Sequence, residues 1–382
     1  MNKIHLNFIR RKIAFKLSKR IKSIGQTSET PSKTSVLLVA TKHELSETQM
    51  YPFYWYQKAL KQQHGIEFCE IDTGTLHHEA LNPKSKPQPH NHIKRIFFQA
   101  EFEMPEGALK ASLGYLQKVY PQAKIAFMDW YAPLHIRPAT IVNDYIDLYI
   151  KKHSYRDFSN YDKQTVGDTN LSDYYAKRHN LNLETMQFTA PDGLESKMML
   201  WTNFGFSPQM MDLFLDDFNY QANRSIDLHA RLAVNGTDWY KAMRQESKDA
   251  VDKLTIPNLK LAANGRVKRY QFFKEMTQSK LCFSPFGYGE VCWRDYESFA
   301  TGALLLKPNM DHLMVDPDIF IPNETYIALN WDLSDFEDQV KEYYQNSNEC
   351  KRIARNAFDV MRQSITNDSA LDLIVSIIHK SN

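Results

Sequence analysis

The stretch SKLCFSPFGYGEVCWRDYESFATGALLL occupies residues 279–306, and its pattern of apolar and glycine residues indicates an α/β fold. The apolar residues 281–283 predict a short strand, which the glycines at positions 287 and 289 end in a loop. A helix is predicted next, because Gly302 lies where glycine commonly ends a helix. The apolar residues after Gly302 then predict a second buried strand, parallel to the first.

Three charged residues follow the glycine loop: Glu290, Arg294 and Glu297. If the helix starts near Glu290, their spacing places all three on one helix face. Loop amides and a helix N-terminus favour phosphate, Arg294 can add a bidentate contact, and a carboxylate two turns along suits ribose hydroxyls. The spacing alone is equally compatible with an ordinary β-α-β unit in which Glu290 and Arg294 form a surface ion pair.

The segments GYGE at 287–290 and RDYESFATG at 294–302 resemble the donor-site signature of GT-B glycosyltransferases. The likeness is greatest to the exostosin-like and bacterial "glycosyltransferase family 1" types. It implies that Glu297 binds the nucleotide ribose and that the glycine loop lies against the diphosphate. Many retaining members carry two glutamates separated by seven residues. Here Glu290 and Glu297 are separated by six, which leaves the role of Glu290 and the anomeric outcome open.

The rest of the chain repeats the alternation of strand and helix, which predicts parallel, doubly wound sheets. The resemblance implies the GT-B arrangement, in which two Rossmann-like domains face a cleft. The predicted strands are 35–40, 66–71, 95–99, 124–128 and 145–150 in the first half, and 226–232, 259–262, 281–283 and 303–306 in the second. Long helices are predicted at 49–64 and 349–379.

These elements divide the chain into five parts. We expect a basic tail and linker at 1–34, an acceptor-side domain at 35–200, an interdomain linker at 201–223, a nucleotide-sugar-binding domain at 224–360, and a C-terminal helix at 361–382 that crosses back to the first domain.

Ligands of doubly wound sheets bind beyond the carboxyl ends of the strands, so the residues that follow strands are candidate site residues. For Asp129 and His135, an ordinary structural role in a loop is the alternative. The donor-binding candidates are Arg231, Ser284, Gly287, Gly289, Arg294 and Glu297, and the catalytic candidates are Asp129, His135 and Glu290.

Composition excludes several other classes of protein. Hydrophobic residues make up 43% of the 382 residues and charged residues 24%, as in a globular chain, and no run of 18 apolar residues predicts a membrane span. Four cysteines without C-x-x-C spacing indicate free thiols in a reducing cytosol. No glycine follows the first strand at 35–40, which argues against a dinucleotide oxidoreductase.

One motif suggests a metal ion. Asp316-Pro-Asp318 matches the D-x-D that binds metal in GT-A glycosyltransferases. It lies in a late loop, ahead of an apolar segment rather than after a strand, so we interpret the match as coincidence. No metal and no cofactor is therefore expected, and the nucleotide sugar would be a co-substrate.

The N-terminus has a charge pattern of its own. Residues 1–22 contain eight Lys and Arg and no acidic residue, with an apolar residue about once per helical turn. A basic amphipathic helix of this kind is typical of a membrane-surface element that binds anionic lipid. A solvated tail and a helix packed on the body are the alternatives. Nucleic acid is not expected as a partner, because the net charge of +2 becomes −6 without these eight residues.

Together these features predict a glycosyltransferase that moves a sugar from a nucleotide-diphosphate donor to a hydroxyl acceptor. We expect the acceptor to be a glycan or lipid-linked glycan in surface polysaccharide assembly, and the protein to lie in the cytoplasm at the inner membrane face. The alternative is a membrane-peripheral scaffold with a degenerate nucleotide-sugar site. A scaffold has no need of Arg294 and Glu297 together.

Overall fold

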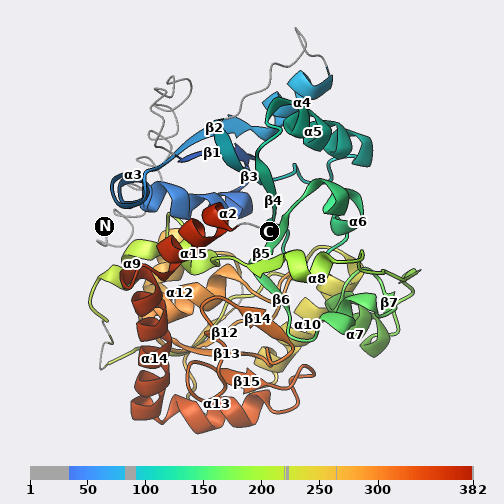
Figure 1. Cartoon of the computed structure of the whole chain (residues 1–382). Coiled ribbons are helices and arrows are strands. Elements are labelled where there is room, and N and C mark those ends of the chain that lie inside the picture. The colour runs from blue at the N-terminus through green and yellow to red at the C-terminus, as the bar shows by residue number, and fades with distance from the viewer. Residues whose placement is uncertain (1–33, 82–91, 219, 221–222, 264, 381–382) are drawn as a thin grey trace.

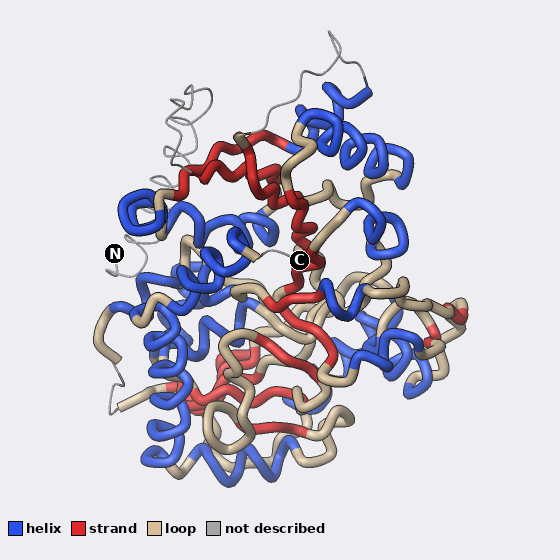
Figure 2. The backbone as a smooth tube through the Cα atoms, viewed as in Figure 1, coloured by secondary structure: helices blue, strands red, loops and turns tan. Residues whose placement is uncertain are grey.

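The computed structural model describes residues 34–81, 92–218, 220, 223–263 and 265–380, and its two parallel sheets lie one above the other (Figure 1). The predicted membrane-binding helix at residues 1–22 lies outside the described residues. The alternation of strands and helices confirms the predicted α/β class with two doubly wound sheets. Figure 2 shows helices that flank the strands of both sheets.

The first sheet has the strand order β2-β1-β3-β4-β5-β9, and every neighbouring pair is parallel. Its strands are apolar over most of their length, as expected for a sheet covered on both faces. The strands are β1 (Thr34–Ala40), β2 (Ile66–Asp72), β3 (Ile93–Phe98), β4 (Lys124–Asp129), β5 (Leu148–Lys151) and β9 (Met198–Leu200). The helices of this half are α2 (Glu44–Trp55), α3 (Gln57–His64), α4 (Thr73–Leu81), α5 (Glu106–Val119), α6 (Ala139–Val142) and the short η1 (Asn143–Tyr145).

The second sheet repeats this topology in the order β11-β10-β12-β13-β15, again entirely parallel. Its strands are β10 (Ile226–Ala230), β11 (Leu261–Ala263), β12 (Ser279–Phe283), β13 (Leu304–Pro308) and β15 (Ile327–Leu329). Its helices are α10 (Asp238–Asp252), α11 (Arg269–Thr277), α12 (Trp293–Thr301), α13 (Phe336–Tyr344) and α14 (Ser347–Thr366).

A polar segment between β5 and β9 of the first sheet carries short elements that the sequence pattern did not predict. It contains β6 (His153–Tyr155), η2 (Phe158–Asp162), β7 (Thr165–Val166), α7 (Asn170–Arg178), β8 (Thr185–Met186) and α8 (Leu194–Lys197), and the crossing that follows β9 contains η3 (Phe204–Phe206) and α9 (Met211–Leu215).

Several pairs of elements bring the halves into contact. Strand β6 pairs antiparallel with β14 (Leu313–Val315) of the second half. The last helix, α15 (Ser369–His379), packs against α2 and α3 of the first half (Figure 1). One apolar cluster therefore includes Val36 of the first sheet, Tyr296 of α12 and Ile374 of α15.

Three predicted helix boundaries differ from the structure. The helix predicted at 49–64 is divided into α2 and α3 at Tyr56, and the one predicted at 349–379 is divided at Asp368, whose φ of 58° is left-handed. Helix α12 begins at Trp293 rather than near Glu290, because the extended Cys292 caps it and the Asp295 carboxylate accepts the Cys292 N–H at 2.8 Å. The predicted polar stripe was therefore wrong for Glu290, which precedes the helix.

Within the described ranges, the structure contains no helix that is both long enough and apolar enough to cross a membrane.

Candidate functional site

The crevice of the second sheet lies between β10 and β12, because the chain leaves β10 for β11 on one side and returns to β12 on the other. Ligands of open α/β sheets bind at such a switch point, beyond the carboxyl ends of the strands. Arg231 follows β10 and Ser284 follows β12, so the fold brings these two donor-binding candidates to the same edge.

Two arginines at this edge are connected to each other. The Arg231 guanidinium binds the Glu275 carboxylate of α11, with Nη2 2.9 Å from Oε1. Arg294 Nη2 donates to the carbonyl oxygen of Arg231 at 2.9 Å, while its buried Nε has no hydrogen-bond partner in the described part of the chain. Arg294 therefore keeps a donor for a ligand, whereas the side chain of Arg231 is engaged by Glu275.

Glu297 lies one helical turn after Arg294 and is almost completely buried. Its Oε1 is 3.2 Å from Nη2 of Arg269 on α11. Burial raises the pKa of Glu297, although Arg269 and Arg294 act in the opposite direction. The pair Arg294 and Glu297 thus shares one face of α12, next to the crevice.

Ser284 belongs to a buried network beneath the glycine loop. Its Oγ donates to Asp295 Oδ1 at 2.6 Å, and Asp295 Oδ2 is 3.1 Å from Lys307 Nζ. The Ser284 N–H donates to the carbonyl of Leu306 at 2.9 Å. Both polar groups of Ser284 are used inside the domain, where they hold the loop to the start of α12.

The two loop glycines differ in what surrounds them. Gly287 N–H donates to the carbonyl of Gly289 at 2.9 Å, which closes a tight turn. A Cβ on Gly289 would lie 1.9 Å from the carbonyl oxygen of Ala132 in the first domain, closer than any side chain tolerates. Glycine at 289 therefore allows the loop to contact the facing domain.

On the first domain, Asp129 ends β4 and its carboxylate is fully buried. Oδ2 accepts from Lys151 Nζ at 2.8 Å and from the Tyr149 hydroxyl at 2.7 Å, and Oδ1 accepts from the Tyr131 N–H at 3.0 Å. Burial alone would raise the pKa of Asp129, but Lys151 and Tyr149 outweigh it and hold the pKa below its usual value. Lys151 Nζ also donates to the carbonyl of His135 at 3.0 Å, so the group supports the loop that follows β4.

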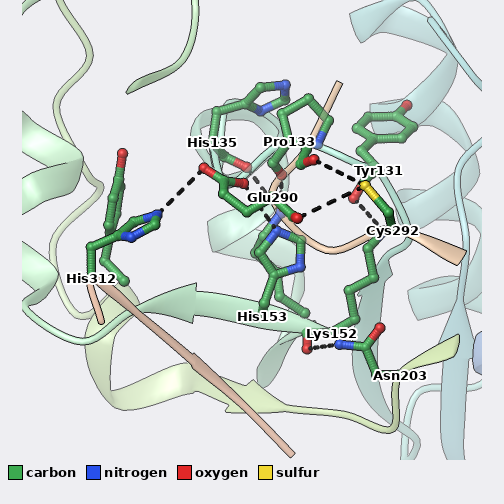
Figure 3. A network of polar contacts seen from close by, with 12 residues as sticks. Tyr131, Pro133, His135, Lys152, His153, Asn203, Glu290, Cys292 and His312 are labelled. Atoms are coloured by element: carbon green, nitrogen blue, oxygen red, sulfur yellow. Dashed lines mark hydrogen bonds and ion pairs between the residues drawn. The ribbon is translucent and has the colours of Figure 1, made fainter. Parts of the chain in front are cut away.

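Glu290 lies opposite this loop, between two histidines. Figure 3 shows its carboxylate between the rings of His153 and His312. Oε2 is 3.6 Å from His153 Nε2 and Oε1 is 3.7 Å from His312 Nε2, so neither oxygen has a hydrogen-bond partner among the described residues although Glu290 is 0% exposed. Burial would raise the pKa of Glu290, but the two histidines outweigh burial and hold the pKa well below its usual range.

The sequence pattern did not single out His153, His312 or the neighbouring Lys152. Burial, reinforced by Lys151, lowers the pKa of Lys152 to about 7, and its Nζ donates to the carbonyls of Trp130 at 3.1 Å and Tyr131 at 2.8 Å. Lys151 is the last residue of β5, and Lys152 and His153 follow it directly. The rule that ligands bind beyond the carboxyl ends of strands could therefore have identified them from the strand predicted at 145–150.

His135 lines a cavity of about 250 Å³. Its Nδ1 is buried and has no hydrogen-bond partner within the described residues. Burial, together with Lys151 and Arg137, lowers the pKa of His135 to about 4. The imidazole is therefore neutral at physiological pH and can exchange hydrogen bonds with a hydroxyl group.

No protein-family model matches this sequence, and no curated protein sequence matches it. An alpha-glucosyltransferase in complex with UDP-glucose and DNA containing an abasic site is similar over 91% of this chain and 100% of its own, at 10% identity and a TM-score of 0.52. A glycosyltransferase from Rickettsia africae ESF-5 is similar over 92% of this chain and 100% of its own, at 11% identity and a TM-score of 0.51. The likeness spans both sheets, and the chain therefore has the GT-B fold.

Proposed function

We propose that this protein is a glycosyltransferase that uses a nucleotide-diphosphate sugar as donor. The observation that carries the proposal is the arrangement of Arg294 and Glu297 on one face of α12 at the switch point of the second sheet, with Glu290 turned toward the first domain. Similar structures that were solved with UDP-glucose or UDP support a uridine nucleotide as the first donor to test.

The donor residues have separate roles in this proposal. Arg294 binds the diphosphate through its unpaired Nε, and Glu297 accepts hydrogen bonds from the ribose hydroxyls. Arg231 positions Arg294 through its carbonyl, and Ser284 holds the glycine loop with Gly287 and Gly289 against the start of α12. The guanidinium of Arg294 and the N-terminus of α12 stabilise the charge on the departing diphosphate. We therefore propose that transfer requires no metal ion.

The reaction forms a bond between the acceptor oxygen and the anomeric carbon and breaks the bond from that carbon to the diphosphate oxygen. The electron pair leaves on the diphosphate, and the proton of the acceptor hydroxyl passes to the departing diphosphate. Glu290, ionised because its pKa is lowered, can stabilise positive charge on the sugar ring and accept hydrogen bonds from it. His135 faces the acceptor side. Asp129, whose carboxylate accepts three hydrogen bonds inside the domain, positions the loop that carries His135.

We further propose that the acceptor is a glycan or lipid-linked glycan at the inner face of an anionic membrane. Residues 1–22 would bind this membrane from the cytoplasmic side and keep the protein close to it. Eight basic residues, each contributing about 1 kcal/mol near an anionic surface, support this proposal. Co-sedimentation with anionic vesicles at low salt tests it. The full chain should bind and a chain beginning at Pro31 should not, and equal binding of the two contradicts the role of the tail.

The alternative of a scaffold with a degenerate site predicts that the donor residues can be removed without loss of nucleotide affinity. We therefore test the function by titrating UDP and UDP-sugars in a calorimeter. Glu297→Ala and Arg294→Ala should each weaken binding by roughly 1.5–3 kcal/mol, the scale of a hydrogen bond to a charged group. Glu342→Ala, a change on the exposed face of α13, is the matched control.

Unchanged nucleotide affinity in both α12 variants would remove the basis of the proposal. Turnover should also survive chelation. If activity is lost completely in chelator and restored by manganese, Asp316 and Asp318 would instead be the candidates for a metal site.

A further inference from the structure

Two cavities adjoin each other where the polar segment 153–188 meets the second domain. One has a volume of about 250 Å³ and reaches His135, and the other has about 460 Å³ and reaches His312. Both are lined by residues of β6, η2 and the start of α7, and we call the two cavities together the depression. The shared lining residues are Tyr155, Asn160, Lys163, Thr165 and Asn170.

Four side chains that line this depression have buried polar atoms without a hydrogen-bond partner in the described part of the chain. They are Asn170 Oδ1, Arg137 Nε, His135 Nδ1 and His312 Nε2. Such atoms are rare in folded proteins, and each calls for an explanation. Four of them around one depression indicate a ligand that both donates and accepts hydrogen bonds, as a sugar hydroxyl does.

The depression also has aromatic walls. Tyr155 lines both cavities and Trp331 lines the larger one. The His312 ring lies between them, with its centroid 6.3 Å from that of Tyr155 and 5.2 Å from that of Trp331. Aromatic faces beside a few fixed polar groups are typical of pockets that orient a ring-shaped ligand.

The charges of the lining residues narrow the ligand class. Arg137 and Lys163 are the cationic residues, and Asp168, Asp173 and Asp311 are the acidic ones. Arg137 pairs with Asp168, and Lys163 Nζ donates to Asn160 Oδ1 at 2.6 Å. The lining therefore has no excess of positive charge, and it disfavours a phosphorylated or otherwise anionic ligand.

We infer that this depression binds the acceptor and that the acceptor is an uncharged saccharide. The inference rests on the proposed function, because only a transferase needs an acceptor beside its donor site. His312 joins the two sites, since its Nε2 is 3.7 Å from Oε1 of Glu290 while its ring lines the larger cavity (Figure 3). A saccharide in the larger cavity would thus contact His312, which lies beside Glu290.

The test uses the full chain saturated with UDP. Binding of neutral disaccharides (maltose, cellobiose, lactose and chitobiose) and of glucose 1-phosphate is measured by saturation-transfer NMR and by the shift in melting temperature. We expect at least one neutral disaccharide to bind more tightly than glucose 1-phosphate. The same disaccharide should accelerate UDP release from a UDP-sugar, because acceptor-dependent transfer then replaces slow hydrolysis.

Two variants locate the site. Asn170→Ala should weaken disaccharide binding about tenfold, because it removes the unpaired Oδ1, and Lys163→Ala, a change at the exposed rim, should weaken it about threefold. Asn182→Ala, an exposed asparagine just beyond α7, is the matched control. UDP affinity should stay the same in all three variants, which also shows that they are folded.

Each result has a defined meaning. If UDP binds but no neutral disaccharide does, or if glucose 1-phosphate binds more tightly, the inference is overturned and the proposed function stands. Disaccharide binding that is equal in Asn170→Ala and the parent also overturns it. If UDP itself fails to bind, the proposed function fails, and the inference fails with it.

Discussion

Asp129 and Glu290 are both completely buried carboxylates, one in each domain, yet their surroundings are opposite. Asp129 accepts three hydrogen bonds, from Lys151, Tyr149 and the Tyr131 amide. Glu290 accepts none from the described residues and has only two histidines beyond hydrogen-bond distance. A buried carboxylate whose bonds are all made inside the protein serves the fold. A buried carboxylate that accepts no hydrogen bond from the protein is available to a ligand.

The largest expected effect is on stability, for Asp129→Asn. The change leaves the charge of Lys151 buried without a carboxylate, which should lower the free energy of unfolding by about 3–5 kcal/mol. Urea denaturation followed by tryptophan fluorescence measures it. A double variant, Asp129→Leu with Lys151→Met, should recover much of the loss because no charge then stays buried. A loss below about 1 kcal/mol for Asp129→Asn would show that the pair does not support the fold.

The second effect is on activity, for Glu290→Gln. Removing the charge beside the reacting sugar should lower kcat about 100-fold, or about 2.7 kcal/mol, as for other groups that stabilise a transition state. The melting temperature should fall less than in Asp129→Asn, because the Glu290 carboxylate makes no hydrogen bond to lose and interacts with its two histidines from beyond hydrogen-bond distance. UDP affinity serves as the control. Equal decreases in melting temperature in Glu290→Gln and Asp129→Asn would contradict the proposed difference between the two carboxylates.

A smaller effect concerns pH and the histidine beside Glu290. Burial, with Lys152 and Lys151, lowers the pKa of His153 to about 4, although Glu290 acts in the opposite direction. The unfolded chain takes up a proton at its ordinary pKa of about 6.5, before the native state does, so stability is present above that pH and is lost as the pH falls toward 4. Between pH 7 and pH 5 this histidine should account for roughly 2 kcal/mol.

His153→Gln should therefore reduce the slope of stability against pH in that interval. It should not abolish the slope, since burial also lowers the pKa of His135 to about 4 and that of His229 to about 3. His78→Gln, at an exposed position on α4, should leave the slope unchanged. A slope that is the same in His153→Gln and the parent would mean that His153 is protonated alike in both states.

Much of the fold could be predicted because its longer strands are apolar runs between glycine and polar segments. The runs at 35–40, 66–71 and 124–128 correspond to β1, β2 and β4. Strands such as β6 and β14 have three residues each, too few for any periodicity, and they exist because they pair with each other across the domains. The candidate functional site was likewise predictable only where local sequence determines it. Arg294 and Glu297 could be recognised from local spacing, but the histidines around Glu290 are brought there by tertiary contacts from distant segments.

The packing of α15 on α2 and α3 has a consequence for synthesis on the ribosome. The apolar cluster that spans both halves contains Ile374, Ile377 and Ile378, which are synthesised after the whole of the second sheet. Nascent domains ordinarily fold in order from the N-terminus, but this first half must wait with exposed apolar surface until α15 has been made. The edge of β6 also has no partner until β14 has been made. Chains that end early should therefore aggregate rather than release a folded first domain.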